Sequence, residues 1–294
     1  MVRKVRRAAA ELSYRLPTPP NKPGRRLVIG VLIPSITNPV FSSSLSSIEN
    51  RMLKAGHGVL IAQSHYDPNR EIDAISALLN ERPTGLILTL CSSKTSQAQT
   101  LPLPPTVLMN NLPTEILPAA VTTANFKAGQ ELTRFLLKLG HRRILFVSGY
   151  FNASDRASLR YDGYRDAMVS GEVSPLEALE IGFVGGYEQL DLSAAMTRFQ
   201  PTAIIASNDL LAIGVIGALR REGLSVPRDI SVAGFDGIVI GRMMDPPLTT
   251  IEMPDTTMGA AAASLLLDMA ENAAPPRHLV LSHTLRQGGT VQAI

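Results

Sequence analysis

Residues 201–236, PTAIIASNDLLAIGVIGALRREGLSVPRDISVAGFD, predict a β-strand, an α-helix and a second β-strand in direct succession. The apolar run Ala203–Ala206 is typical of a strand buried on both faces. Asn208 follows it, and its side chain can accept a hydrogen bond from a free N–H group at a helix start. Gly223 favours a left-handed helix stop. Between these two signals, apolar residues repeat at helical spacing: Leu210, Leu211, Ile213, Val215, Ile216 and Leu219.

A polar residue ends each strand of this unit. Asn208 comes directly after the first strand, and Asp236 ends the second strand, which begins at Ile230. In open parallel sheets, small ligands bind at the carboxyl ends of the strands. Asn208 and Asp236 therefore mark a candidate ligand-binding edge.

The same alternation of strand and helix patterns runs through the chain and predicts an α/β fold with a parallel, doubly wound sheet. The apolar runs that predict further strands are 26–33, 58–62, 85–90, 106–109, 143–147 and 179–183. Helical spacing is found at 40–52, 71–79, 126–139, 160–168 and 187–199.

Composition indicates an ordinary globular protein. The 294 residues can form two cores, and the chain is 45% apolar and 18% charged. We see no apolar run of the roughly 20 residues that a membrane span needs, and no secretory signal. The single cysteine, Cys91, excludes an internal disulfide and fits a reducing compartment. These features predict a cytoplasmic protein without membrane partners.

The charge is unevenly distributed. Residues 1–26 contain eight basic residues and one acidic residue, so they carry +7, and the remaining residues carry −4 of the total of +3. A basic arm on an acidic body is typical of nucleic-acid binding, although a solvated, disordered tail has the same composition.

The pattern AxNDLLAxGxxxALRREGLxVPxDISVxGFD in residues 206–236 resembles the effector-binding core of the lac repressor family. That family shares its fold with periplasmic sugar-binding proteins. The resemblance implies two doubly wound parallel-sheet subdomains joined by three crossovers, a periplasmic binding protein type I-like fold. We place the crossovers near residues 140–141, 251–252 and 281–283. The expected N-terminal subdomain is 27–140 plus 252–281, and the C-terminal subdomain is 141–251 plus 282–294.

Residues 1–26 are expected to be a remnant of the DNA-binding headpiece followed by a proline-rich linker. VRKVRRAAAELSYR, residues 2–15, resembles the last helix of the family's headpiece, whose helix-turn-helix would lie before Met1. Either the start codon is placed too late or direct base recognition has been lost, and both explanations stay open. The expected DNA contacts are basic: Arg3, Lys4, Arg6, Arg7 and Arg15.

The resemblance and the strand-end rule together predict nine ligand-binding residues. Amides can donate to and accept from hydroxyl groups, aromatic rings stack on apolar sugar faces, and a guanidinium grips hydroxyl pairs or carboxylates. Structural roles are the alternatives: turns and caps for the asparagines, core packing for the rings, a helix surface for the arginine, and a hinge for the glutamate. The nine are Asn38, Phe41, Asn110, Asn111, Arg160, Phe183, Asn208, Asp236 and Glu252.

Enzyme motifs are missing from the sequence. We find no glycine-rich dinucleotide loop after a strand, no phosphate-binding P-loop and no nucleophile elbow. The five histidines are scattered, and nothing near Cys91 would activate a thiolate. The sequence therefore predicts a non-enzymatic protein without a metal site or a cofactor.

These observations predict a ligand-responsive transcriptional regulator of the repressor type. The expected partners are a small polar effector (a sugar or a sugar acid), a second copy of the chain in a homodimer, and operator DNA if the headpiece is complete. Two alternatives use the same fold: a solute-binding protein of a sugar transporter, and a truncated sensor paralogue without operator binding.

Overall fold

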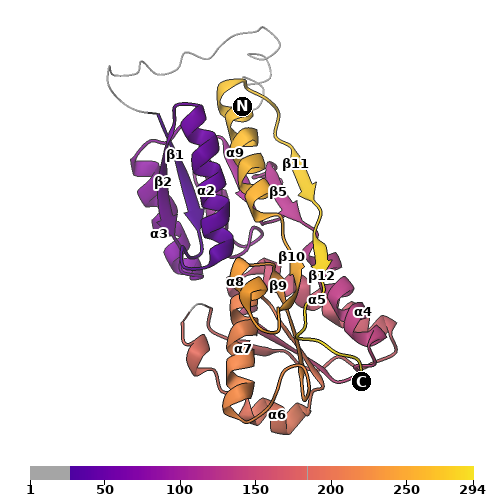
Figure 1. The fold of residues 1–294 in the computed structure, drawn as a ribbon. Coiled ribbons are helices and arrows are strands. Elements are labelled where there is room, and N and C mark those ends of the chain that lie inside the picture. Colours follow the sequence, from indigo (N-terminus) through magenta and orange to yellow (C-terminus); the bar gives the residue numbers. More distant parts are fainter. Residues whose placement is uncertain (1–26, 184) are drawn as a thin grey trace.

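The computed structural model describes residues 27–183 and 185–294. Their alternating strands and helices form two six-stranded sheets, each the centre of one lobe in Figure 1. All recorded strand pairs are parallel except the one between the last two strands of the second sheet, so both sheets need helical crossovers. The predicted fold class, two doubly wound subdomains, is confirmed.

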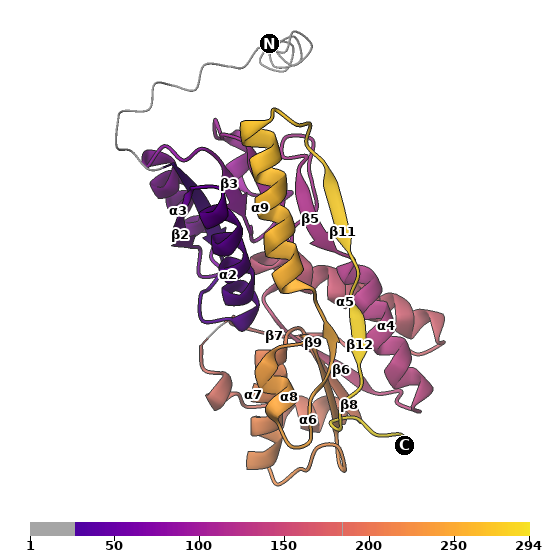
Figure 2. The same ribbon diagram turned by 45° about the horizontal axis from the view of Figure 1, so that its top comes forward.

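The first lobe has its helices on both faces of its sheet. In spatial order its strands are β2 (Gly58–Gln63), β1 (Val28–Ile33), β3 (Leu86–Leu88), β4 (Thr106–Met109), β5 (Ala120–Thr123) and β11 (His278–Leu281). Its helices are α2 (Pro39–Lys54), α3 (Pro68–Asn80) and α9 (Asp255–Glu271), with the 3-10 turn η1 (Gln97–Thr100). Helices α2 and α9 lie side by side on one face, and α3 covers the other (Figures 1 and 2).

The second lobe repeats this arrangement. Its strands are, in spatial order, β7 (Leu179–Ile181), β6 (Ile144–Gly149), β8 (Ala203–Ala206), β9 (Ser231–Asp236), β10 (Thr249–Glu252) and β12 (Thr284–Arg286). Its helices are α4 (Asn125–Lys138), α5 (Asp155–Ser170), α6 (Ser193–Phe199), α7 (Asp209–Arg221) and α8 (Val239–Met243), with the turns η2 (Phe151–Ala153) and η3 (Tyr187–Gln189). Helices α6 and α7 pack on one face, α4 and α5 on the other.

The strand–helix–strand unit of residues 201–236 forms as predicted. Strand β8 is completely buried, and Asn208 caps α7 by accepting a hydrogen bond from the Leu211 N–H at 2.9 Å. Gly223 has a φ of +79°, the left-handed conformation that ends a helix. Strands β8 and β9 pair in parallel, so Asn208 and Asp236 lie at the same edge of the second sheet.

The chain passes between the lobes three times, and the first passage differs from the prediction. Helix α4 packs against α5, and its buried residues Leu132 and Leu136 join the core of the second lobe. The passage therefore lies between β5 and α4, and the prediction that the first subdomain extends to residue 140 is wrong. The apolar face of α4 predicted a buried helix but carried no information on which core would bury it. The other passages lie between β10 and α9 and between β11 and β12.

The helix expected over 187–199 is broken in the structure. The turn η3 precedes it, and α6 begins only at Ser193, whose N–H donates to the Asp191 side chain at 2.9 Å. This local side-chain bond competes with helix continuation, because it offers the backbone N–H another partner.

Candidate functional site

A cavity of about 40 Å³ lies between the two lobes. That volume holds a few water molecules, because one water needs roughly 10–15 Å³ of such space. Seven of the nine predicted ligand-binding residues line it: Asn38, Phe41, Asn110, Arg160, Phe183, Asn208 and Asp236. The family resemblance and the strand-end rule together had selected these seven residues, whose role in ligand binding stays a prediction. Five further lining residues with polar or aromatic character were not predicted: Tyr66, Ser154, Arg156, Ser207 and Asp255.

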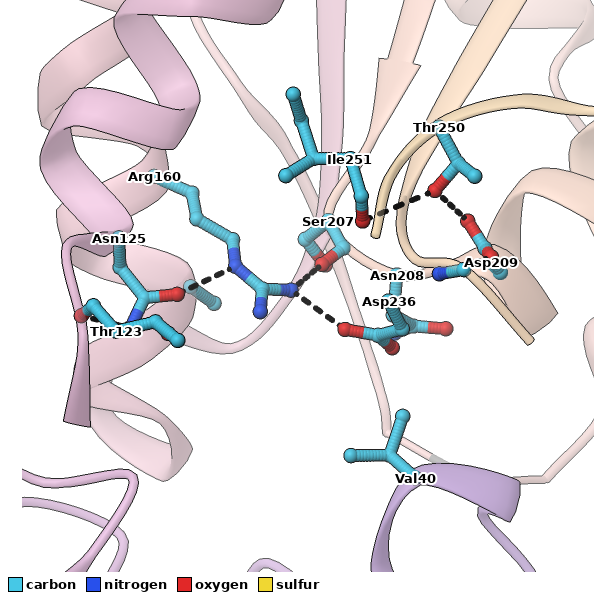
Figure 3. Close-up of polar contacts among 12 residues, drawn as sticks. Val40, Thr123, Asn125, Arg160, Ser207, Asn208, Asp209, Asp236, Thr250 and Ile251 are labelled. Atoms are coloured by element: carbon cyan, nitrogen blue, oxygen red, sulfur yellow. Dashed lines mark hydrogen bonds and ion pairs between the residues drawn. The ribbon is translucent and has the colours of Figure 1, made fainter. Parts of the chain in front are cut away.

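An ion pair between Arg160 and Asp236 forms the polar wall of the second lobe. The Arg160 Nη1 donates to Asp236 Oδ1 at 3.2 Å and to the Ser207 carbonyl at 2.6 Å. Its Nε donates to Asn125 Oδ1 at 2.9 Å, so the guanidinium is held from two sides (Figure 3). Both partners are more than 90% buried. Asp236 thus lines the same cavity as Arg160 and Phe41, and its contact with a ligand stays a prediction.

Close helix packing sets the position of Arg160. A Cβ on Gly163 would lie 2.0 Å from the Phe126 carbonyl oxygen, and one on Gly129 would lie 2.1 Å from that of Arg160. Only glycine at both positions lets α4 and α5 approach this closely.

The turn that carries Asp236 is held by a second carboxyl group. Asp236 has a φ of +113°, an unusual conformation for a non-glycine residue, and Gly237 follows at +76°. Asp209 Oδ2 accepts hydrogen bonds from the N–H groups of Gly237 and Ile238 at 2.8 and 2.9 Å. Its Oδ1 accepts from the Thr250 hydroxyl at 2.6 Å (Figure 3). Asp209, expected only as part of a helix start, therefore fixes the conformation of Asp236.

Burial raises the pKa of both acids. The pKa of Asp236 rises to about 6, with burial opposed by the Arg160 charge. Burial and the neighbouring Asp236 raise the pKa of Asp209 to about 8. Burial thus disfavours the charged form of both acids, and the Arg160 charge opposes this effect at Asp236.

Three aromatic rings close the cavity across both lobes. Tyr66 of the first lobe stacks on Phe183 of the second at a centroid distance of 4.2 Å and an angle of 7°. Phe41 meets Tyr66 edge-on at 6.4 Å, and the Asn38 Nδ2 donates to the Tyr66 hydroxyl at 3.2 Å. Tyr66 could have been found from the sequence, because the segment after strand β2 is another strand end with a polar aromatic residue.

Asn111 lies outside the cavity, where Cys91, Ser93 and Asn111 of the first lobe contact Asp155 of the second; we call this contact the seam between the lobes. Asn111 is completely buried, and its side chain exchanges two hydrogen bonds with the Leu90 backbone, at 2.7 and 2.9 Å. Its Nδ2 also donates to both carboxylate oxygens of Asp155, at 3.0 and 2.9 Å. The prediction that Asn111 faces the ligand fails because every polar atom of its amide is already bonded to protein.

Glu252 also lies outside the cavity lining. It ends β10, and its Oε1 is 2.7 Å from both Arg242 Nη2 and Arg286 Nε. Two cations engage this carboxylate outside the cleft, so the structure does not bring Glu252 to the ligand side. Its neighbour Asp255, at the start of α9, lines the cavity instead.

The remaining expectations concern metal, membrane and DNA. Within residues 27–183 and 185–294, no group of three potential metal-binding side chains is found. No helix of this part is long and apolar enough to cross a membrane. Burial raises the pKa of the Cys91 thiol to about 12, so it is not an activated nucleophile. The five expected DNA contacts, between residues 3 and 15, lie outside the described residues.

Comparisons with known proteins point to one family. Residues 133–291 match the family described as "Periplasmic binding protein-like domain". The ribose operon repressor of Escherichia coli (strain K12) is 30% identical over 278 residues, which are 90% of this chain and 82% of the repressor. The structure of transcription regulator GntR from Chromobacterium violaceum is 31% identical, with a TM-score of 0.79 over 90% of this chain and 98% of that one.

A LacI family transcriptional regulator from Enterococcus faecium, solved with bound ribose, is 26% identical, with a TM-score of 0.80 over 91% of this chain and 99% of that one. These relatives are transcription regulators, which fits the prediction that the chain is not an enzyme. Fold, sequence identity and matched length agree: the chain belongs to the lac repressor family of transcription regulators and carries its periplasmic binding protein-like domain.

Proposed function

We propose that this chain is a ligand-responsive transcriptional repressor that works in the cytoplasm and binds a sugar or a sugar acid between its lobes. The observation that carries the proposal is the buried Arg160–Asp236 pair, which faces aromatic rings across an interlobe cavity. Such a pair presents both a donor and an acceptor to a polyol, and a ring covers its apolar face. The relative with bound ribose supports this ligand class.

The ligand is proposed to act on lobe closure. Phe183 now fills the space beside Tyr66, and a cavity of about 40 Å³ is too small for a sugar. Binding therefore requires Phe183 to move or the lobes to separate slightly before they close on the ligand. The ligand then favours one closure angle in proportion to its affinity for that state. The altered angle would be transmitted to the basic arm that precedes the first lobe.

A homodimer is part of the proposal, because the closure angle must be read by a second copy. Helix α8 on the second lobe exposes three apolar side chains, Val239, Ile240 and Met243, the last of them 79% exposed. Apolar clusters of this kind are typical of interaction surfaces. Met243→Asp should shift sedimentation from dimer toward monomer, whereas Val169→Asp, at an exposed apolar residue of α5, serves as the control. A sedimentation profile that neither variant changes would argue against α8 as the contact.

Ligand binding is tested by calorimetry and thermal unfolding with a panel of pentoses, hexoses and sugar acids. A ligand of the native state raises the melting temperature with concentration. Arg160→Met and Phe183→Ala should abolish or strongly weaken the response. Arg165→Met, on the exposed side of the same helix α5, should leave it unchanged.

The variants at the ion pair need a folding control. Breaking a buried pair costs about 3–5 kcal/mol of stability, so Arg160→Met must be titrated well below its own melting temperature. Phe183→Ala removes no buried charge and gives an independent result. If no member of the panel changes wild-type stability, the sugar-binding function is wrong.

DNA binding is tested by an electrophoretic mobility shift on the DNA upstream of the chain's own gene. Both this chain and one extended before Met1 are compared. Replacing Arg3, Lys4, Arg6, Arg7 and Arg15 by glutamine should reduce the slope of log affinity against log salt by up to about 4–5. A specific shift by the extended chain alone supports the repressor, and no shift by either favours a sensor or solute-binding role.

A further inference from the structure

Arg156 is a buried cation whose side chain is only partly paired. It lies in the first turn of α5, lines the interlobe cavity, and is 6% exposed. Its Nη1 donates to the Leu90 carbonyl at 2.9 Å. Its Nη2 is also buried and has no hydrogen-bond partner among the described residues. A buried guanidinium nitrogen without a partner is costly, because it has lost water and gained nothing in exchange.

The neighbouring Asp155 is a weak counterion for Arg156. Its Oδ1 lies 3.4 Å from Arg156 Nη1, which is long for a charge-assisted hydrogen bond. Both of its oxygens already accept from the Asn111 amide, and Oδ2 also accepts from the Ser93 N–H at 3.3 Å. Asp155 is not among the residues that line the cavity. The Asp155 carboxylate is therefore bonded to groups at the seam between the lobes and does not face the cavity.

Arg160 differs from Arg156 because it has a close counterion. Arg160 lies four positions after Arg156 on the same helix, so both side chains project from one face. Arg160 is neutralised inside the cavity by Asp236 at 3.2 Å and has two further acceptors. The cavity wall thus contains one arginine that is paired with a carboxylate and one whose buried Nη2 has no partner among the described residues.

The other acid of the wall does not balance the second arginine at neutral pH. Asp255 is buried, which raises its pKa to about 8, and the charge of Asp236 adds to this rise. The charged form of Asp255 is thus disfavoured. Two guanidinium groups line the wall, and Asp236 is paired with Arg160 and not with Arg156.

Three more polar atoms of cavity-lining residues lack partners among the described residues: Asn110 Nδ2, Ser207 Oγ and Asp255 Oδ1. Asn110 stands on the first lobe and Asp255 at the passage between the lobes, so they face the cavity from other directions than Arg156. An occupant that carries hydroxyl groups in addition to an anionic group could pair with these atoms and with Arg156 Nη2.

We propose that Arg156 binds an anionic group of the effector, and that the effector is a polyhydroxy carboxylate (a sugar acid) rather than a neutral sugar. The inference rests on the proposed function and narrows its ligand class. The one unpaired guanidinium nitrogen, Arg156 Nη2, fits a monoanionic carboxylate better than a phosphate dianion, since a dianion would bring more negative charge into the buried site than this donor can balance.

The test is calorimetry at pH 7 with ligand pairs that differ at one group: D-glucuronate with D-glucose, D-galacturonate with D-galactose, and D-gluconate with D-glucitol. D-glucose 6-phosphate tests whether a phosphate binds in place of the carboxylate. At least one acid should bind about 10- to 100-fold more tightly than its neutral partner, the range that one charge-assisted hydrogen bond supplies.

Arg156→Met should remove this preference by weakening the acid about 10- to 100-fold and the neutral partner much less. Arg156→Lys keeps the charge and should retain part of the preference. Arg165→Met controls for the loss of one positive charge on α5 and should retain all of it. Circular dichroism and melting temperatures establish that each variant is folded, and the lysine variant still tests the proposal if the methionine variant does not fold.

Two outcomes overturn the inference while sugar binding stands. One is equal affinity for the acid and neutral members of every pair that binds, and the other is an acid preference that survives Arg156→Met. Tighter binding of D-glucose 6-phosphate than of every acid overturns the carboxylate assignment. If none of these compounds binds the wild-type chain, the proposed function fails together with the inference.

Discussion

Asp209 shows how one residue supports a site that it does not line. Its two carboxyl oxygens join the start of α7 to the turn after β9 and to Thr250 on β10. Gly234 makes room for it, because a Cβ there would lie 2.4 Å from Asp209 Oδ1. The unusual conformation of Asp236 is thus maintained by bonds to the two residues that follow it.

Replacing Asp209 should separate hydrogen bonding from charge. Asp209→Ala leaves the N–H groups of Gly237 and Ile238 unpaired and buried, and we expect a loss of about 2–5 kcal/mol in the free energy of unfolding. Asp209→Asn keeps an acceptor for both N–H groups and should cost much less. Urea unfolding at pH 6 measures both. Equal losses in the two variants would contradict this role for Asp209.

Buried acids also predict how stability changes with pH. Burial holds the pKa of Asp209 and Asp255 at about 8, far above the ordinary value of 3.8 that the unfolded chain has. Between these values the unfolded state binds fewer protons than the native state, so the free energy of unfolding falls as pH rises. We expect stability to decrease from pH 5 to pH 8, and to decrease less steeply in Asp209→Asn. Urea titrations at four pH values measure the slope, and a rise in stability over this window would contradict the prediction.

Among the contacts between elements, the one between α4 and α5 leaves the least room for a larger side chain. Gly163→Ala places a Cβ against the backbone carbonyl of Phe126, which cannot move without shifting α4. We expect a loss of about 1–3 kcal/mol, and weaker ligand binding because Arg160 moves with its helix. Gly217→Ala on α7 is the control, since its Cβ would meet only the Arg221 side chain at 3.6 Å. There alanine should stabilise by about 0.5–1 kcal/mol. Equal effects in both variants would refute the packing argument.

Elements defined by local signals were predictable from the sequence. The β8–α7–β9 unit follows from an apolar run, an asparagine cap and a glycine stop, all of which act within a few residues. The lobe that receives α4 was not predictable, because an amphipathic helix fits either core until the glycine contact with α5 is known. Strand β5 (AVTT) was missed, because two threonines hide its burial.

The residues of the site also differ in whether a local sequence signal or the packing of the lobes places them. A residue directly at a strand end, such as Asp236, could be predicted because parallel strands bring their carboxyl ends together. Arg156 and Asp255 come from helix starts that reach the cavity only through the packing of the two lobes. Asn110 and Asn111 are neighbours in sequence, yet only Asn110 lines the cavity, and no local pattern distinguishes them.

For the whole molecule, the decisive contact is the seam on one side of the cavity. Asp155, at the first turn of α5, accepts hydrogen bonds from Asn111 and from the Ser93 N–H, both of the first lobe. Its own N–H donates to the Cys91 carbonyl at 2.8 Å. Glu71 fixes the same loop by accepting from the Cys91 N–H at 2.6 Å. The hydrogen bonds of Asp155 connect the two lobes and exist only while the lobes are close together, so they stabilise the closed arrangement.

Removing this connection should shift the molecule toward an open state. Asp155→Ala deletes the acceptor, and without ligand the radius of gyration measured by small-angle X-ray scattering should increase. Ligand should reverse the increase, because it binds the closed state and shifts the population toward it. The apparent affinity should fall by the factor by which the closed population falls, since only that fraction is competent to bind. Asp162→Ala, at an exposed position of the same helix, should change neither quantity. A weaker affinity without any change in the radius of gyration would mean that Asp155 acts on Arg156 locally and not on lobe closure. An increase in the radius of gyration that ligand does not reverse would mean that effector binding does not depend on lobe closure.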